Sequence, residues 1–197
     1  MTRKPGLSRD AILDAAIGLL DRDGLAALSM RKLGAALGVE AMSLYNHVPS
    51  KDSLLDGIHE RILLSLDPPA SARSWQAFVR HQANALHRAL LAHPNAIPLF
   101  ATRPAATPAA IERLDRYLEV LLRAGFKPLD ALSVIQLVAQ LVVGHAMWTT
   151  SVDMAIIDDD APKHVQQVVR VIQKWDPDRE LELGIDALLH GFERLRS

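Results

Sequence analysis

Apolar residues recur along this chain at intervals of three and four residues, the spacing that places them on one face of an α-helix. No segment of any length alternates apolar and polar residues as a half-buried β-strand does. The prolines fall between the periodic segments or at their starts, where a missing backbone N–H does least harm. The pattern therefore predicts an all-α fold. The expected helices cover residues 8–24, 29–38, 40–46, 50–66, 73–92, 94–102, 107–124, 128–150, 162–174 and 178–195.

Two of the short helices meet at a glycine-centred turn near the start of the chain. Ser29 can cap the first of them, and Gly38, which tolerates a positive φ, can end it. The second has few apolar positions, Ala41, Leu44 and Val48, so the helices around it must supply its core. Such a pair is typical of a helix-turn-helix, whose second helix inserts its N-terminal residues into the DNA major groove.

Basic groups are concentrated at the N-terminus of an otherwise nearly neutral chain. The whole sequence holds 22 Lys and Arg against 23 Asp and Glu, whereas residues 1–51 hold seven basic and five acidic groups. The net charge is +2 for that segment and, from the remaining 15 basic and 18 acidic groups, −3 for the rest. The positive potential therefore lies in the segment that contains the predicted helix-turn-helix.

Several classes of protein are disfavoured. Without Cys the chain has no disulfide, thiolate metal site or cysteine nucleophile. Neither nucleotide-binding glycine motifs nor the common hydrolase and di-iron motifs are present, so we expect no catalytic residue, no cofactor and no metal. The acidic run Asp158–Asp160 lacks the spaced oxygens of a calcium loop. A signal-peptide run is absent and the longest apolar stretch, Leu132–Trp148, is interrupted by polar residues, which favours a cytoplasmic protein without a membrane span.

The segment GLAALSMRKLGAALGVEAMSLYNHVPSKDSLLDGI, residues 24–58, resembles the DNA-binding domain of TetR-family transcriptional regulators. The shared features are the leading Gly-Leu, the Ser that opens the second helix, Arg-x-Leu inside it, Leu-Gly-Val at the turn, Leu-Tyr-x-His in the third helix and the Lys that begins the fourth. AHPNAIPLF (92–100), LLRAGFKP (121–128) and ELGIDALLHGFERL (182–195) resemble the C-terminal domains of tetracycline-repressor-like members.

The resemblance implies a DNA-binding domain over residues 1–51, joined through the helix 50–66 to a ligand-binding and dimerisation domain over residues 52–197. Asp67–Ser71, with the sequence DPPAS, is the clearest linker. The implied function is that of a homodimeric repressor, which leaves a near-palindromic operator in double-stranded DNA when a small-molecule effector enters the larger domain. Two rival classes stay open: a dimeric helical scaffold, and a small-molecule-binding helical protein or enzyme without DNA binding. Salt-sensitive DNA binding would separate the regulator from both.

The resemblance also assigns residues to the DNA. The start of the second helix approaches the duplex, the start of the third reads bases, and the residues after it hold phosphates. Ala41 and Met42 lack the amide groups that make bidentate adenine contacts, so we expect readout through methyl contacts and DNA shape. The alternatives are a core ring for Tyr45 and a helix C-terminal cap for His47. The expected DNA-binding residues are Ser29, Met30, Arg31, Glu40, Ala41, Met42, Ser43, Tyr45, Asn46, His47 and Lys51.

Polar and aromatic side chains interrupt the apolar helices of the larger part. A mostly apolar cavity with a few convergent polar groups is what a small-molecule site requires. Gln136 and Gln140, one helical turn apart, would cost free energy if buried unpaired, and they could equally pair across a dimer interface. The candidate ligand-binding residues are Asn84, His87, Phe100, Arg103, Tyr117, Gln136, Gln140, His145 and Trp148.

The last helix favours a dimer. Its apolar residues follow a 4-3-4-3 spacing beside a row of small residues that permits close helix approach. Helix 128–150 is apolar nearly all round and needs partners on several sides. The two helices could form an intersubunit four-helix bundle, as the resemblance implies; the alternative is that both stripes bury inside one subunit. The expected interface residues are Leu181, Gly184, Ile185, Leu188, Gly191, Phe192 and Leu195.

Overall fold

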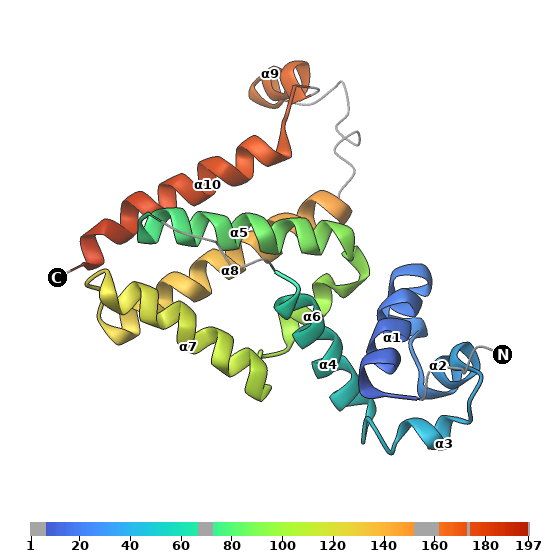
Figure 1. The fold of residues 1–197 in the computed structure, drawn as a ribbon. Helices are drawn as coiled ribbons and strands as arrows, with labels where there is room; N and C mark the ends of the chain where they lie inside the picture. The colour runs from blue at the N-terminus through green and yellow to red at the C-terminus, as the bar shows by residue number, and fades with distance from the viewer. Residues whose placement is uncertain (1–6, 67–72, 152–161, 173, 197) are drawn as a thin grey trace.

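The computed structural model describes residues 7–66, 73–151, 162–172 and 174–196, and within these ranges the chain is helical and contains no β-strand (Figure 1). The all-α prediction is therefore confirmed. The α-helices are α1 (Arg9–Asp23), α2 (Met30–Leu37), α3 (Ala41–Leu44), α4 (Lys51–Leu64), α5 (Trp75–Ala92), α6 (Ile97–Thr102), α7 (Pro108–Arg123), α8 (Pro128–Ser151), α9 (Lys163–Ile172) and α10 (Pro177–Phe192). The short 3-10 helices are η1 (Leu25–Ala27), η2 (Pro94–Ala96) and η4 (Glu193–Leu195).

Side-chain caps begin the first helices at the predicted positions. The hydroxyl oxygens of Ser8, Ser29 and Ser50 each accept a hydrogen bond from the backbone N–H three residues later. Gly38 ends α2 in the left-handed conformation, with φ 68° and ψ 32°. The predicted linker Asp67–Ser71, after α4, lies outside the described residues.

Two predicted helices are shorter or divided. The helix predicted over 40–46 is the single turn α3, because the N–H groups of Tyr45 and His47 bond to carbonyls three residues earlier instead of four. The helix predicted over 94–102 divides into η2 and α6. Pro98, near the start of α6, lacks the N–H that would bond back into η2.

The first four helices surround one hydrophobic core. Ile12 of α1, Leu44 of α3 and Ile58 of α4 are fully buried in it. Ala96 of η2 and Leu99 of α6 belong to the same cluster, although they follow the predicted linker in the sequence. The N-terminal helices therefore share their core with the next part of the chain: α1 contacts η2, and α4 lies beside α6 (Figure 1).

A second core fills the larger helical part, where α5, α6, α7 and α10 all pack against α8. The rings of Trp75 and Phe126 meet edge to face at 4.8 Å within it. Among the described helices, α8 alone is long and apolar enough to cross a membrane, judged by length and composition. A core helix of a soluble protein passes the same test, and α8 packs against α5, α6, α7 and α10.

Helix α10 turns its predicted dimer stripe into its own subunit. Leu181, Ile185 and Phe192 are at most 5% exposed and pack in the larger core, and Leu188 packs against the same core. For Leu181, Ile185 and Phe192 the prediction of contact with a second subunit is corrected, because α5 and α8 of the same chain already cover these side chains. Leu188, Gly184, Gly191 and Leu195 keep exposed surface, and their place in the interface stays a prediction. The exposed face of α10 carries Leu183 instead, which is 69% exposed.

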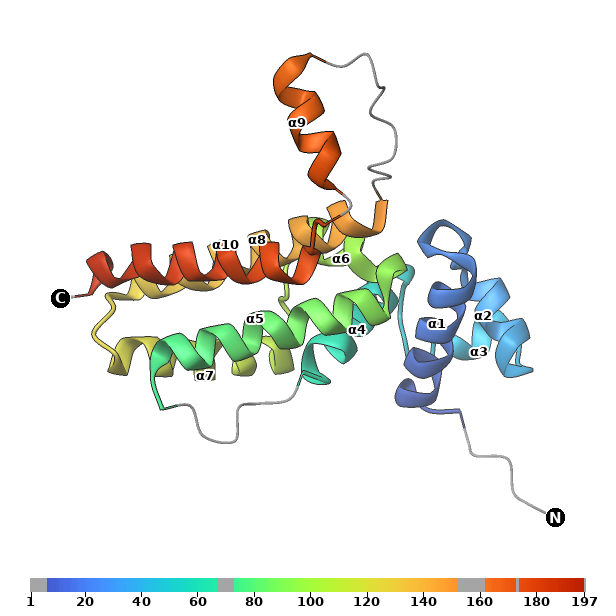
Figure 2. The same ribbon diagram turned by 90° about the horizontal axis from the view of Figure 1, so that it is seen from above.

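Helix α9 stands away from the remaining helices (Figure 2). None of its residues is buried, and Val165, Val168 and Val171 are exposed on its surface. Within the subunit, α9 therefore contributes little to either core.

Candidate nucleic-acid interface and ligand cavity

Helices α2 and α3 approach so closely that one position of α2 has room only for glycine. A Cβ on Gly34 would lie 2.9 Å from the carbonyl oxygen of Val39 and 3.1 Å from the backbone nitrogen of Ala41. The backbone N–H of Val39 donates to the Gly34 carbonyl at 2.9 Å. Backbone contacts therefore hold the turn and set the direction in which α3 leaves it.

Most predicted DNA-binding residues lie at the surface around α3. Met42 is 72% exposed and Tyr45 is 40% exposed, whereas Leu44 and Val48 are buried and anchor this segment in the N-terminal core. Tyr45 is therefore not a core ring. Of the other predicted residues, Arg31, Glu40, Asn46, His47 and Lys51 are exposed, and Ser29, Ala41 and Ser43 are partly exposed.

Met30 is the exception among these residues. Its side chain is 7% exposed and packs in the N-terminal core with Leu33. The hydroxyl of Ser29 caps the helix, so Met30 occupies its first turn on the inward face. This placement corrects the prediction that the Met30 side chain contacts DNA.

Two cations, one in α2 and one at the start of α4, form no ion pair with a described carboxylate. Among the described residues, Arg31 and Lys51 take part in no ion pair, and Lys32 lies 4.0 Å from Asp23 at the limit of one. On the opposite side of the unit, Arg61 pairs with carboxylates of α1 at 2.7 and 3.0 Å. The positive potential of the N-terminal unit is therefore directed toward the exposed face of α2, α3 and the start of α4.

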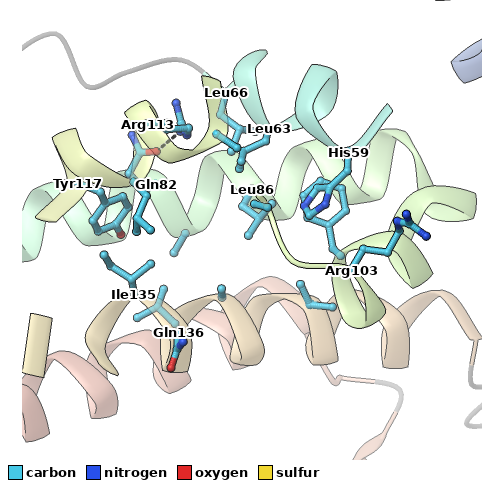
Figure 3. Close-up of a pocket in the computed structure, with 18 residues that line it drawn as sticks. His59, Leu63, Leu66, Gln82, Leu86, Arg103, Arg113, Tyr117, Ile135 and Gln136 are labelled. Atoms are coloured by element: carbon cyan, nitrogen blue, oxygen red, sulfur yellow. Dashed lines mark hydrogen bonds between the residues drawn. The ribbon is translucent and has the colours of Figure 1, made fainter. Parts of the chain in front are cut away.

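A cavity of about 310 Å³ lies in the larger part, between α4, α5, α6, α7 and α8 (Figure 3). This volume lies at the lower end of the range of small-molecule sites. Most of its wall is aliphatic, contributed by Leu, Ala, Val and Ile side chains of the five helices and the segments that follow them. Its polar or ionisable lining consists of His59, Gln82, Arg103, Arg113, Tyr117 and Gln136.

Four of the nine predicted ligand-binding residues line this cavity: Phe100, Arg103, Tyr117 and Gln136. Gln136 is nevertheless exposed, and its amide points away from the cavity centre in Figure 3. The other five lie elsewhere, which corrects their assignment. Gln140, His145 and Trp148 line a shallow groove between α8 and α10, Asn84 donates to Glu182 at 2.6 Å, and His87 lies 3.3 Å from His145.

The helical repeat explains this division of α8. Gln140, Gly144 and Trp148 follow one another at four-residue intervals and therefore share the face toward α10. Val138 and Val143 belong to the face that borders the cavity. A polar residue on α8 reaches the cavity only if it lies near that second face.

Three polar cavity residues were not predicted: His59, Gln82 and Arg113. Each occupies an apolar register of its helix, which is the signal that could have identified it. Arg113 lies three residues after Ala110 and four before Tyr117, so the three share one face of α7.

The ionisable rings of the cavity are held in their neutral forms. Burial lowers the pKa of His59, which outweighs the opposing effect of Asp56, and its ring meets Phe100 edge to face at 4.2 Å. Burial likewise raises the pKa of the Tyr117 phenol, whose ring packs against Phe78 at 4.8 Å. The rings at both ends of the cavity are therefore uncharged at neutral pH.

Arg103 connects the cavity to the first turns of α4. Its guanidinium lies 2.8 Å from a carboxylate oxygen of Asp56 and 3.2 Å from one of Asp52. The charged end of the side chain points away from the centre of the cavity (Figure 3). Arg103 is thus engaged with α4, and only its aliphatic part is available to a ligand.

The described residues contain no group of three or more side chains that could hold a metal ion. The acidic run Asp158–Asp160 lies outside those residues.

Comparison with known proteins identifies the family. Residues 12–58 match the model of the bacterial regulatory proteins of the tetR family, and residues 68–195 match that of the tetracyclin repressor-like C-terminal domain. The chain is 30% identical over 193 residues to the tetracycline repressor protein class E of Escherichia coli, and the alignment covers 94% of this chain and 90% of that protein.

Two solved structures share this fold over nearly the full length of the chain. The crystal structure of apo ActR from Streptomyces coelicolor superposes with a TM-score of 0.84 at 27% identity, and covers 97% of this chain and 96% of ActR. The structure of ActR in complex with actinorhodin gives a TM-score of 0.81 at 25% identity, with coverage of 96% and 98%. The chain therefore belongs to the TetR family and is a DNA-binding transcriptional regulator.

Proposed function

We propose that the protein is a cytoplasmic, homodimeric repressor that leaves a near-palindromic operator when a small molecule occupies the cavity. Residues 1–51 would bind the operator, and residues 52–197 would bind the effector and the second subunit. The observation that carries this proposal is the double role of α4. Its residues Ile58 and Ile62 are buried in the N-terminal core, whereas His59 and Leu63 of the same helix line the cavity.

The names of two relatives support the proposal that the effector is a small organic molecule. ActR has been crystallised in complex with actinorhodin, and a relative that aligns with 94% of this chain is a tetracycline repressor. Both names describe proteins that are associated with a small organic molecule. The cavity of this chain, with its aliphatic wall and few polar groups, fits that class of ligand.

Ion pairs fasten α4 to α1, so the two helices move together. Arg61 pairs with Asp10 and Asp14, at 3.0 and 2.7 Å, and Arg9 pairs with Glu60 at 3.0 Å. A ligand that displaces α4 would therefore also displace α1 and the helix-turn-helix that packs on it. The two recognition helices of a dimer must fit DNA grooves at one fixed spacing, so a small displacement weakens operator binding.

A second connection runs through η2. The side-chain amide of Asn95 donates to the carbonyl oxygens of Leu20 and Asp21, at 3.1 and 3.0 Å, at the end of α1. The imidazole of His93 lies 2.9 Å from the carboxylate of Asp21. The end of α1 is therefore held by the segment that leads into α6, which itself borders the cavity.

The strength of the switch is limited by thermodynamics. The free energy by which a ligand weakens operator binding cannot exceed the difference between its binding free energies for the two conformations of the protein. A coupling free energy of about 1–3 kcal/mol would weaken operator binding roughly 5- to 150-fold, and saturating operator would weaken ligand binding by the same factor. Selection of bound DNA from a random pool, followed by a search for molecules that release it, tests the proposal. Failure to bind any DNA in a salt-sensitive manner would favour the scaffold or ligand-binding alternatives.

The exposed groove between α8 and α10 supports the proposal that the protein is a homodimer. Leu183 and Trp148 are 69% and 53% exposed at its edges, and Gly184 and Ala187 keep its floor low. Small residues of this kind allow another helix to approach closely. We propose this face as the dimer interface, in place of the buried stripe of α10.

The DNA-binding face leads to a prediction for Lys51. Replacement of Lys51 by Ala should weaken binding to operator and to random DNA alike, because an exposed ammonium contacts phosphates without regard to sequence. The slope of log affinity against log salt concentration should decrease by about 1. Fluorescence anisotropy over a salt series measures both quantities. Met42→Ala and Ser43→Ala are the contrasting variants, since they should change which base is selected; equal losses on operator and random DNA would remove both residues from base readout.

The coupling route leads to a prediction for Arg103. Replacement of Arg103 by Gln removes the ion pairs with Asp52 and Asp56. Effector binding should persist, but the factor by which an effector identified in the release search weakens operator binding should fall toward 1. Titrations of operator with and without that effector give the factor.

Arg123→Gln serves as the control, because it breaks an exposed ion pair with Glu119 at the far end of α7. Unchanged release by the effector in Arg103→Gln would show that the ion pairs of Arg103 with α4 are not needed for coupling.

A further inference from the structure

Among the residues that the structure describes, one cation of the cavity, Arg113, forms no ion pair with a carboxylate. Arg113 projects from α7 beside Gln82 at one end of the cavity (Figure 3). Its Nη2 donates a hydrogen bond to Oε1 of Gln82, a neutral amide on α5 that is itself buried. The salt bridges of the described residues do not include this guanidinium, and the cation of Arg116 is close enough to disfavour its charge. A half-buried guanidinium without a counter-charge costs free energy, and an anion bound beside it would reduce that cost.

The other arginines of this part of the molecule show the contrast. Arg103, at the opposite end of the same cavity, pairs with two carboxylates of α4. Arg80 of α5 likewise pairs with two carboxylates of α10, those of Glu182 and Asp186. Within the described ranges, the partly buried Arg61, Arg80 and Arg103 all pair with acidic side chains, whereas Arg113 does not.

The groups around Arg113 make its positive charge still less favourable. Burial and the charge of Arg116 both lower the pKa of Arg113, so the site disfavours the cation. An arginine nevertheless stays protonated in proteins, and the positive charge persists in the cavity. The rings of His59 and Tyr117 are neutral, so they neither compensate this charge nor add a second one.

We propose that the effector is a mainly apolar, aromatic acid whose carboxylate, or an equivalent anionic group, is bound by Arg113. This proposal rests on the proposed function, because it specifies the ligand of the same cavity. Gln82 occupies one of the five N–H donors of the guanidinium, which leaves donors for a bidentate contact with a carboxylate. The aliphatic wall and the rings of Phe100 and Tyr117 would surround the rest of the molecule.

Two fluorescent probes with the same rings test the proposal. Anilinonaphthalene sulfonate carries an anionic group, and N-phenylnaphthylamine lacks it. Arg113→Gln should weaken binding of the sulfonate roughly 10- to 100-fold, the scale of a charge-assisted hydrogen-bonded pair, and change the affinity of the neutral amine by less than about 2-fold. Arg113→Lys, which keeps the charge, should recover part of the loss. In the absence of ligand, Arg113→Gln should change the melting temperature little, because relief of a cation without a carboxylate partner among the described residues offsets the lost hydrogen bond to Gln82.

Two further variants locate and calibrate the binding. Ala139→Phe fills the cavity and defines which part of each fluorescence signal comes from it. Arg123→Gln removes the same charge from an exposed position of α7 and should leave both affinities unchanged. If both probes bind the cavity and Arg113→Gln weakens them equally or not at all, the anionic effector is ruled out while the ligand site stands. If Ala139→Phe changes neither signal, the cavity takes no aromatic molecule, and the effector part of the proposed function fails together with this inference; DNA binding is measured independently.

Discussion

Replacement of Leu183 by Asp is expected to convert the protein into a monomer and to weaken operator binding by roughly 10²- to 10⁴-fold, the gain that two linked binding events normally provide. Leu183 is 69% exposed in the subunit, so the new carboxylate would be hydrated in the monomer. In the proposed dimer it would be desolvated against the groove that contains Leu141 and Gly184, twice per dimer. Analytical ultracentrifugation at micromolar concentration and operator titrations measure the two effects.

Phe192→Asp and Leu122→Asp separate assembly from folding. Phe192 is 5% exposed and packs in the larger core, so a carboxylate there should cost several kcal/mol of subunit stability. Leu122, an exposed residue of α7, should accept the same change without loss of the dimer. A Leu183→Asp protein that remains dimeric would place the interface elsewhere than on the groove between α8 and α10.

Replacement of Gly34 by Ala is expected to weaken operator binding at least about 10-fold and to destabilise the N-terminal unit by about 1–3 kcal/mol, the usual cost of overpacking. The added methyl group would meet the carbonyl oxygen of Val39 at 2.9 Å. That neighbour is backbone, so it can yield only if the turn moves and α3 changes its direction. Urea unfolding and operator titrations measure the two losses.

Gly18→Ala is the matched control, because nothing lies within 4 Å of a Cβ at this position of α1. It should raise stability by up to about 1 kcal/mol, from the higher helix propensity of Ala, and leave DNA affinity unchanged. If Gly34→Ala and Gly18→Ala had equal stability and equal operator affinity, the turn between α2 and α3 would accommodate the added methyl group without cost.

The helix-turn-helix was predictable because its signals are local. The cap at Ser29, the left-handed turn at Gly38 and the inward side chain of Leu44 each depend on a few neighbouring residues. The same reasoning misplaced Met30, because the inward face of a first turn depends on how α2 packs against α1. Local patterns thus predict an element more reliably than its orientation.

The cavity and the dimer face depend on contacts between distant segments. Tyr117 was predicted and Arg113 was not, although both line the cavity from one face of α7. The position of Arg113 in an apolar register does not by itself indicate a cavity residue. The packing of α5 and α8 near α7 places it in the cavity wall. The stripe of Leu181 and Phe192 has the same spacing whether its partner is the same subunit or another, and only the observed burial distinguishes the two.

The shared core of α1, α4 and α6 limits how freely this regulator could exchange its parts with relatives. A hybrid joined at the linker, residues 67–71, would combine one protein's α1 with another protein's Ala96 and Leu99, which complete the same core. The bonds from Asn95 to the end of α1 would also have to be matched. A hybrid that transfers operator specificity should therefore include η2 and α6 along with the first four helices. The boundary of the N-terminal core lies after α6, whereas the linker in the sequence lies before α5.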